Sequence, residues 1–419
     1  MDIRSRLAQR SQGIRVSRIR ELQHYLSVPG MISFGGGYPN PETFAFREVG
    51  ITFSSDSLGH ISEDARSTAF QYGPTSGSPD LLRKLLSWHN ERDAVSLNEA
   101  NCAIVNGSQE GLFILSFLFL EQEDSVVIAE PAYPGIIMTC SLFTREIIPV
   151  ALDDGGMKVG HLADILAHRR RKGMKSPKFI YTVPSGHNPT GVTASSARRG
   201  ELLALAEEYD TLIIEDDPYR LIFFGDGEQP PTIQSLESTA KRVIRLDSFS
   251  KILAPGLRMG YVTGSPEIIE MVASLKQNIN LQTGMLVQAF VDTYFDAHTP
   301  HEINEMIHGN RCKYKYNRDC MIDTARAALP EYIDFHKPSH GFFIWFKMPG
   351  EFDSDRMIRE DSRRYGVLLV PGNAFAIRSD LKYFMRASFV TTRGSDIQRG
   401  IKRFSEMILA EERRIGKAQ

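Results

Sequence analysis

The sequence has few cysteines, no long apolar run and almost no net charge. Its four cysteines are scattered without the spacing of metal ligands, so they predict reduced thiols and no metal site. No apolar stretch reaches the roughly 20 residues that a bilayer span needs. A formal net charge of -2 offers no basic surface to nucleic acid or to an anionic membrane. We therefore expect a globular protein whose partners are small molecules bound by local groups.

The N-terminal stretch has two interpretations. The first 20 residues contain six arginines, as a mitochondrial transit peptide would, but Asp2 and Glu21 are atypical of such peptides. The alternative for this stretch is an amphipathic helix of the mature fold. We expect a cytoplasmic protein, with the mitochondrial matrix as the alternative compartment.

What the sequence does have is a regular alternation of β-branched runs and helical segments in its middle part. The candidate strands are residues 103–105, 125–129, 178–183, 211–215, 242–246 and 260–263. Several are apolar throughout, as expected for strands that are buried on both faces. This pattern predicts an α/β fold with a mostly parallel sheet.

The C-terminal part has a different pattern. After a long helical stretch near residues 285–328, short strand-like runs alternate with helices, which predicts a smaller α+β domain. The strand-like runs are residues 342–346, 367–370 and 383–388. At 419 residues the chain is too long for one ordinary core. We predict a large domain of residues 46–300 and a small domain of residues 1–45 and 301–419.

Chemically active side chains follow several candidate strands. Asn188, Asp216 and Lys251 each come shortly after one of them. The carboxyl ends of parallel strands meet at one edge of a sheet, where ligands bind in α/β proteins. The sequence therefore predicts that these three residues converge on one site.

Lys251 lies on a turn that also carries Ser248 and Ser250, and Arg258 follows seven residues later. A lysine amine can hold an aldehyde as a Schiff base, and a neighbouring cation favours its reactive, neutral form. The hydroxyls and the arginine can bind a phosphate, and Asp216 can pair with a pyridinium nitrogen. Together these are the requirements of pyridoxal 5'-phosphate. For Lys251 alone, a surface lysine at a turn is the alternative.

Three other residues predicted to bind the cofactor have competing interpretations. Asp216 has two rivals, Glu215 and Asp217, and acidic residues after a strand are often only helix N-caps. Tyr219 can hydrogen-bond the phenolic oxygen of the cofactor, or it is a core tyrosine with a satisfied hydroxyl. Asn188 can donate to the same oxygen, but the turn sequence around it explains its presence equally well.

Residues 107–111 follow a candidate strand and open an apolar helix. The backbone N–H groups at the start of a helix, with the Ser108 hydroxyl, make a phosphate site. A capping box with Ser108 as N-cap is excluded, because Gly111 cannot provide the return bond. The groups that would complete the phosphate site are Ser248, Ser250 and Arg258.

Two further residues are candidates for the site. Tyr133 can stack on the cofactor ring. Arg386 lies within an apolar strand-like run, and a buried arginine needs a carboxylate partner. If no Asp or Glu provides that partner, the α-carboxylate of a substrate can; a structural ion pair is the alternative.

With these residues identified, the sequence resembles the fold-type I aminotransferases that depend on pyridoxal 5'-phosphate. Within them it is similar to the group of kynurenine/2-aminoadipate and aromatic aminotransferases. The shared stretches are residues 33–41, 71–77, 107–109, 130–133, 181–184, 188–191, 214–219, 247–251, 371–375 and 386–388. The resemblance implies a mostly parallel seven-stranded sheet in the large domain. It also implies transfer of an amino group from an aromatic, 2-aminoadipate- or kynurenine-like amino acid to a 2-oxo acid such as 2-oxoglutarate.

The resemblance assigns a role to each cofactor-binding residue. Lys251 is implied as the Schiff-base lysine and Asp216 as the partner of the ring nitrogen. The phenolic oxygen would be held by Asn188 and Tyr219. The implied phosphate ligands are Ser108, Gln109, Ser248, Ser250 and Arg258. Tyr72 would reach in from the other subunit of a homodimer with shared active sites.

The resemblance also implies a substrate pocket. Arg386 and Asn188 would bind the α-carboxylate, together with the backbone near Gly37. Tyr38 stands where the kynurenine enzyme has an aliphatic residue, which would reshape the pocket. Arg20 matches an arginine near the side-chain pocket of that enzyme, which favours acidic or aromatic substrates without choosing between them.

Other functions fit part of the same pattern. A C–S lyase, a decarboxylase or a cyclopropane-forming synthase can use such a site, because a fold does not fix a reaction. A non-enzymatic regulator would need a DNA-binding domain before Ser33, and we expect the residues there to be too few for a winged helix.

Overall fold

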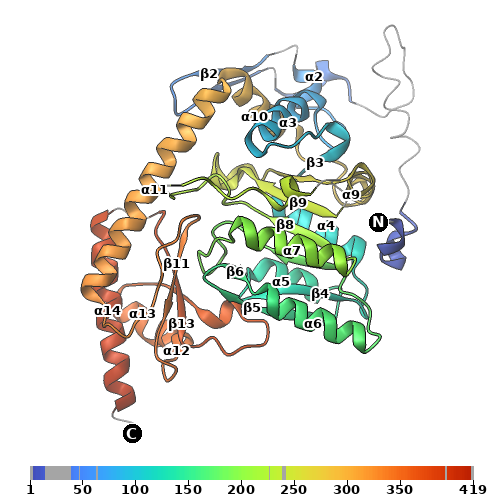
Figure 1. The fold of residues 1–419 in the computed structure, drawn as a ribbon. Helices are drawn as coiled ribbons and strands as arrows, with labels where there is room; N and C mark the ends of the chain where they lie inside the picture. Colours follow the sequence, from blue (N-terminus) through green and yellow to red (C-terminus); the bar gives the residue numbers. More distant parts are fainter. Residues whose placement is uncertain are drawn as a thin grey trace. The chain divides into compact units, whose positions relative to one another are not determined.

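The structure of the protein, a computed structural model, describes residues 3–14, 39–46, 48–62, 65–225, 227–237, 242–391 and 394–416 (Figure 1). The chain forms two compact units. Unit 1 consists of Met1–Glu121 and Gln234–Glu305, and unit 2 of Gln122–Ile233 and Met306–Gln419. The predicted large and small domains have other bounds, and that division stays a prediction.

Unit 1 contains three strands in the order β3-β10-β9. They are β3 (Cys102–Val105), β10 (Gly260–Thr263) and β9 (Val243–Ser248). The central β10 is antiparallel to both neighbours, and Gly260 lies opposite Val105 on one side and Ser248 on the other. The carboxyl ends of β3 and β9 therefore meet at the same edge, beside the start of β10.

Helices and a hairpin complete unit 1 (Figure 1). The α-helices are α2 (Arg66–Ala69), α3 (Pro79–Asp93), α4 (Ser108–Phe119), α9 (Pro266–Ile279) and α10 (Met285–Ala297). The hairpin pairs β1 (Val49–Thr52) with β2 (Leu58–Ile61). The 3-10 turns are η1 (Arg4–Arg6), η2 (Gln9–Ser11), η4 (Pro41–Thr43), η5 (Glu99–Asn101), η6 (Phe249–Lys251) and η7 (Pro255–Leu257). The N-terminal segment contacts the end of α4, where the Ala8 N–H donates to the Leu118 carbonyl (2.7 Å).

Unit 2 contains five strands in the order β8-β7-β4-β5-β6. They are β8 (Leu212–Asp216), β7 (Phe179–Thr182), β4 (Ser125–Glu130), β5 (Glu146–Asp153) and the two-residue β6 (Gly156–Met157). The first four are parallel to one another, which confirms the predicted α/β fold with a mostly parallel sheet. In the described residues these strands and the three of unit 1 number eight, one more than the predicted seven, because the two-residue β6 pairs antiparallel with β5. The candidate strands did not include β5, which Pro149 interrupts.

The helices of this part of the chain lie between its strands, as in other α/β proteins. They are α5 (Pro134–Ser141), α6 (Val159–Arg171) and α7 (Ser196–Glu208). The chain passes from one unit to the other within α8 (Ile233–Leu236) and within the long α11 (Pro300–Ala328). The predicted helical stretch near 285–328 is therefore two helices, α10 and α11.

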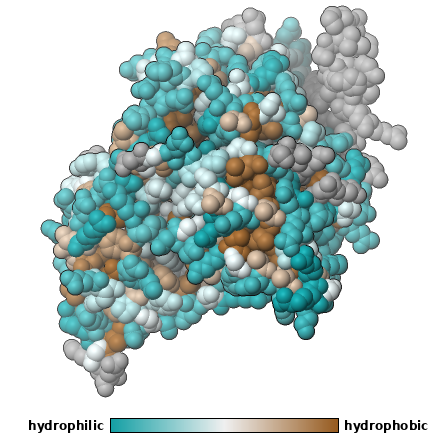
Figure 2. Space-filling view, viewed as in Figure 1, coloured by the Kyte–Doolittle hydropathy of each residue, from teal (hydrophilic) through white to brown (hydrophobic). Residues whose placement is uncertain are grey.

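A second, antiparallel sheet in unit 2 has the order β11-β13-β12. Its strands are β11 (Phe343–Lys347), β13 (Phe384–Ser388) and the short β12 (Val370–Pro371), close to the three predicted runs. The helical elements here are α12 (Ser354–Arg356), η8 (Met357–Asp361), α13 (Ser362–Tyr365), η9 (Gly372–Phe375) and α14 (Gly394–Gly416). Over the described ranges, no helix is both long and apolar enough to cross a bilayer. The face drawn in Figure 2 is mainly hydrophilic, with several apolar patches.

A buried cluster of charges fastens α3 to β9 in unit 1. The Arg245 Nε and Nη2 atoms donate to the two carboxylate oxygens of Asp247 at 2.7 and 2.9 Å. Arg92 of α3 reaches the same carboxylate (3.5 Å), and its Nε donates to Asp93 (3.0 Å). Burial alone would raise the pKa of Asp247, but the nearby Arg245 and Arg92 guanidiniums lower it below its usual value. The cluster therefore holds Asp247 as an anion directly before Ser248.

We expect Asp247→Asn to lower the free energy of unfolding at pH 7 by about 3 to 5 kcal/mol, because it removes the anion that accepts both short hydrogen bonds of buried Arg245 and leaves only the more distant Asp93 (3.9 Å). Since the folded-state pKa of Asp247 is depressed, its contribution is present above the unfolded pKa of about 4 and is lost as the pH falls through the folded value. Urea unfolding at pH 7 measures the difference. The exposed Asp164→Asn in α6 is the control, with an expected change below about 0.5 kcal/mol. A loss below about 1 kcal/mol in Asp247→Asn would contradict this account.

Candidate active site

One edge of the unit 1 sheet gathers the residues predicted to bind phosphate. Ser108 follows β3, Ser248 ends β9, and Arg258 directly precedes Met259 and β10. Since Gly260 pairs with the last residues of both β3 and β9, these three segments lie together. Lys251 is in η6, the 3-10 turn that leaves β9, and the Ser248 hydroxyl fixes that turn by accepting from the Ser250 N–H (3.2 Å).

Gly107 brings Arg258 to the start of α4. It is the N-cap of this helix and has φ +74°, a conformation that favours glycine. A Cβ atom on Gly107 would lie 2.7 Å from Arg258 Nη2, so a larger residue at this position would displace the guanidinium. A guanidinium beside the N–H groups of a helix N-terminus forms a site for an anion.

The Ser108 hydroxyl supports the same assignment. Ser108 is the first residue of α4, and within the described ranges its buried Oγ has no hydrogen-bond partner. Buried hydroxyls are nearly always hydrogen-bonded, and one left open at a helix N-terminus beside an arginine suits a phosphate oxygen. The residues present here therefore fit the phosphate end of pyridoxal 5'-phosphate.

The cap of α4 differs from the one considered in the sequence. The N-cap is Gly107, not Ser108, so that Glu110 and not Gly111 is the third helical residue. Glu110 accepts hydrogen bonds from the Asn106 N–H (2.6 Å) and Nδ2 (3.2 Å), which ties down the turn before the helix. It also faces Lys276 (3.8 Å), whose pKa burial lowers to about 8 while Glu110 opposes the shift. Sequence reasoning missed Glu110 because it placed the cap one residue too late.

Unit 2 gathers the residues predicted to face the cofactor ring. Tyr133 follows β4, Asn188 follows β7, and Asp216 ends β8 with Tyr219 three residues later. Because β4, β7 and β8 are parallel, all four residues lie at the carboxyl edge of this sheet. The structure therefore brings together, within unit 2, side chains that lie far apart in the sequence.

Hydrogen bonds distinguish Asp216 from its two rivals. The Tyr181 hydroxyl donates to Asp216 Oδ2 (2.7 Å), and the carboxyl is 4% exposed. Glu215 points to the opposite face of β8 and accepts the Ile233 N–H (2.8 Å). Asp217 accepts from Ser185 Oγ (3.2 Å). The tyrosine partner places Asp216 with the aromatic residues of the site.

Tyr181 was not predicted. It lies on β7 opposite Ile214, on the face of the sheet where Asp216 also points. Burial, with the negative charge of Asp216, raises the pKa of Tyr181 well above its ordinary value, so its hydroxyl remains a donor. A lone hydroxyl within an apolar strand was the available signal, because a buried tyrosine needs a partner.

Arg386 on β13 has an unusual environment for a buried arginine. Its Cζ lies 4.2 Å from the centre of the Phe343 ring and 4.9 Å from that of Phe375. Its Nη1 donates to the side-chain oxygen of Asn188 (2.8 Å), while its buried Nε has no partner within the described ranges. No carboxylate of those ranges pairs with it, so the structural ion pair considered in the sequence is absent there. Burial lowers the pKa of Arg386, with nearby Tyr219 opposing the shift. The open donor on a stacked guanidinium suits a carboxylate ligand.

Tyr219 and His187 complete this edge. Tyr219 packs edge-on against Phe342 and Phe343, with ring centres 5.4 and 5.9 Å apart. Burial raises the pKa of Tyr219, and nearby Arg386 opposes the shift. His187 is buried, which lowers its pKa to about 3, and its Nδ1 lies 3.1 Å from Thr190 Oγ1. His187 therefore supports the turn after β7 as a neutral ring.

Several predicted site residues are not tested by this geometry. Arg20, Gly37 and Tyr38 lie outside the described residues. Tyr72 is 51% exposed on unit 1. Gln109 follows Ser108 in the first turn of α4.

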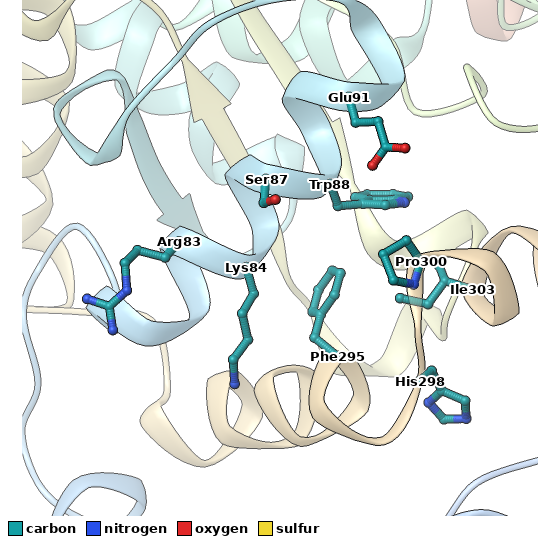
Figure 3. Close-up of a pocket in the computed structure, with 9 residues that line it drawn as sticks. All are labelled: Arg83, Lys84, Ser87, Trp88, Glu91, Phe295, His298, Pro300 and Ile303. Atoms are coloured by element: carbon teal, nitrogen blue, oxygen red, sulfur yellow. The ribbon is translucent and has the colours of Figure 1, made fainter.

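A cavity of about 360 Å³ in unit 1 lies away from the predicted site residues (Figure 3). Trp88 of α3 and Phe295 of α10 form part of its wall, with ring centres 6.0 Å apart. Lys84 at its mouth pairs with Asp292 (2.9 Å). None of the residues predicted to bind a cofactor lines this cavity.

Comparisons with known proteins agree with the chemistry of the two edges. The family model described as Aminotransferase class I and II matches residues 55–404. The aromatic-amino-acid aminotransferase 1 of Thermococcus litoralis is 33% identical over 416 residues, which cover 98% of this chain and 96% of that protein. The mitochondrial kynurenine/alpha-aminoadipate aminotransferase of Mus musculus is 32% identical over 399 residues, covering 90% and 92%. The crystal structure of the Pyrococcus horikoshii kynurenine aminotransferase with PMP gives a TM-score of 0.79 at 34% identity, with 98% of each chain covered.

The family match includes every site residue from Tyr72 to Arg386. The buried Ser108 hydroxyl and the anion site at Arg258 fit a phosphate, and Asp216 fits a pyridine nitrogen. The chain belongs to the class I and II aminotransferases, and it is a transaminase whose cofactor is pyridoxal 5'-phosphate.

Proposed function

We propose that the protein transfers an amino group from an aromatic, 2-aminoadipate- or kynurenine-like amino acid to a 2-oxo acid such as 2-oxoglutarate. The names of its relatives support this substrate class. The observation that carries the proposal is Arg386, a half-buried arginine whose buried Nε is an open donor within the described ranges and whose Nη1 donates to the Asn188 amide. Amino acids and 2-oxo acids share a carboxylate next to the reacting carbon, and Arg386 is a group that can hold both.

The phosphate of the cofactor is assigned to the unit 1 edge. Its proposed ligands are Ser108, Gln109, Ser248, Ser250 and Arg258. The helix N-terminus and the guanidinium supply the positive potential that this otherwise nearly neutral chain lacks. Tyr72 is proposed to reach the phosphate of a second copy, which makes the protein a homodimer. Its exposure on unit 1 leaves it accessible for that role.

The ring of the cofactor is assigned to the unit 2 edge. Asp216 would keep the ring nitrogen protonated, and Tyr133 would stack on the ring. Asn188 Oδ1 accepts from Arg386, which orients its Nδ2 group as a donor, and with Tyr219 it would hold the phenolic oxygen. When bound, the cofactor supplies an aldehyde that takes up the amino group and a ring that withdraws electrons from the α-carbon.

The chain's own residues carry out the remaining steps. The Lys251 Nζ would hold the cofactor in the resting enzyme, and as a free amine it would move a proton at the substrate α-carbon. Arg386 would bind the carboxylate of the amino acid and of the 2-oxo acid, and so restrict the orientation of the neighbouring reacting carbon. Arg20, Tyr38 and the backbone at Gly37 are proposed to line the side-chain pocket. The proposed compartment is the cytoplasm, with the mitochondrial matrix as the alternative.

The test of this function is a half-reaction followed by absorbance. Purified holoenzyme is mixed with single amino acids: 2-aminoadipate, kynurenine, tyrosine, leucine and glutamate. We expect conversion of the cofactor to its amine form with the aromatic and 2-aminoadipate-like donors, and reversal by 2-oxoglutarate. Release of ammonia or carbon dioxide without such conversion would assign the protein to lyases or decarboxylases instead.

Lys251→Ala is expected to bind the cofactor without a covalent link and to lose at least about 100-fold in kcat, since both the anchoring amine and the proton carrier are removed. Borohydride treatment and mass spectrometry should find cofactor on the Lys251 peptide of the wild type and none in the variant. Lys402→Ala, at an exposed position of α14, serves as control. Wild-type turnover by Lys251→Ala would disprove the assignment.

Arg386→Ala is expected to raise KM for amino and 2-oxo acids by the equivalent of about 2 to 5 kcal/mol, the cost of losing a buried contact to a carboxylate. Arg386→Lys should recover only part of this, because an ammonium cannot form the planar paired contact. Steady-state kinetics measure both, with exposed Arg399→Ala as control. An unchanged KM in Arg386→Ala would show that Arg386 only supports the fold.

A further inference from the structure

Glu130 at the end of β4 is a carboxylate that the assigned functions leave unexplained. Its Oε1 accepts the backbone N–H groups of Ile377 (2.6 Å), Arg378 (2.7 Å) and Ser379 (3.0 Å). Its Oε2 accepts the Ser379 hydroxyl (2.7 Å). Three successive N–H groups that converge on one oxygen form an anion-binding nest, and here a side chain of the same unit fills it.

These contacts exclude Glu130 as a proton acceptor in the reaction. Burial would raise its pKa, but the hydrogen bonds from residues 377–379 lower it below the usual value. A carboxylate held in this way remains charged and has few lone pairs left for a substrate. The role of Glu130 must therefore come from the two segments of the chain that it connects.

Glu130 connects two segments that carry site residues. On one side, the chain continues from Glu130 to Tyr133, the proposed stacking residue. On the other side, residues 377–379 are separated by one residue from Phe375, whose carbonyl accepts the Ala132 N–H (2.9 Å). The same two segments are therefore joined both by the Glu130 carboxylate and by a backbone hydrogen bond.

Phe375 is one of the two rings that enclose the Arg386 guanidinium (4.9 Å). Its position depends on a loop that is closed by Asn373, whose side-chain oxygen accepts the Leu381 N–H (2.7 Å). Gly372 cannot carry a side chain, because a Cβ there would lie 2.1 Å from the Leu381 carbonyl oxygen. The loop is thus fastened at Asn373 within itself and at Glu130 to the Tyr133 segment.

We infer that Glu130 is a positioning residue for the substrate carboxylate: by holding residues 377–379 it keeps Phe375 against Arg386 in register with Tyr133. The inference rests on the proposed function, since it concerns how Arg386 grips a substrate. Loss of Glu130 frees the loop, so that the guanidinium loses one wall and the carboxylate is held in a wider range of positions.

The test uses the holoenzyme and three substitutions of graded strength. Glu130→Leu keeps the size and removes all acceptors, Glu130→Gln keeps one oxygen, and Ser379→Ala removes a single donor. We expect Glu130→Leu to raise KM for both the amino acid and the 2-oxo acid by about 10- to 100-fold, with a smaller change in kcat. Glu130→Gln should give an intermediate rise and Ser379→Ala the smallest; if the leucine variant does not fold, these two decide.

Two readouts do not depend on turnover. Hydrogen exchange of the peptide that contains residues 376–381 should quicken in the Glu130 variants. The dissociation constant for 3-phenylpropanoate, an amino-free carboxylate titrated through the cofactor's absorbance, should rise in parallel with KM. The control is Glu302→Gln, another carboxylate that accepts a backbone N–H, from Thr299 (2.7 Å), at the start of α11 in unit 1. Its KM and dissociation constant should stay at the wild-type values.

The outcomes separate the inference from the function on which it rests. Faster exchange or a lower Tm in the Glu130 variants, with KM and the dissociation constant within about twofold of wild type, would show a structural role only and overturn the inference. In that case the wild type would still convert its cofactor with amino acids. A wild type that fails to convert would overturn the proposed function and the inference together.

Discussion

The direction of the strands is the constraint from which the site follows. β4, β5, β7 and β8 are parallel, and the residues of β4, β7 and β8 are buried almost without interruption. Such strands have no room for unpaired polar groups along their length, so chemistry is confined to the edge where they end. In unit 1, β10 runs against β3 and β9 and brings their carboxyl ends to one edge in the same way.

Two buried arginines show how the fold separates structural from functional charge. Arg245 is fully buried, and both of its paired contacts go to Asp247 in the same strand. Arg386 is partly buried between aromatic rings and has an amide instead of an anion as its neighbour. Burial disfavours the charge of both guanidiniums. Within the part of the chain that the structure describes, Arg245 is paired with carboxylates of its own unit and Arg386 is not. A carboxylate substrate would supply the anion that Arg386 lacks there.

Sequence alone was sufficient for features that follow from one strand and the turn after it. The order of apolar runs indicated the strands; Asn188 and Lys251 each follow one, and Asp216 ends one. The structure also supports the choice of Asp216 over Glu215, which the sequence left open, because the choice depends on the face of β8 to which each points.

What sequence reasoning missed depends on contacts between distant segments. Tyr181 has a role in the site because it hydrogen-bonds Asp216 on the next strand. Glu130 has one because it binds a loop nearly 250 residues later in the chain. Glu110 was missed for a local reason, since moving a helix cap by one residue changes which side chain can close it. β5 was missed because a proline lies in its middle, although its ends are ordinary strand. The pattern of residue types along one segment carries no information on its hydrogen bonds to a distant segment.

The small space at Gly107 limits which residues this position can accept. The guanidinium of Arg258 occupies the volume that any larger residue would need, and the positive φ disfavours replacement even if the arginine moved. Position 107 is therefore closed to mutation as long as a phosphate must be bound there. The aromatic enclosure of Arg386 is made of replaceable side chains on a loop and a strand. Substitutions in this enclosure can therefore change how the substrate carboxylate is held while the phosphate end of the cofactor site stays constant.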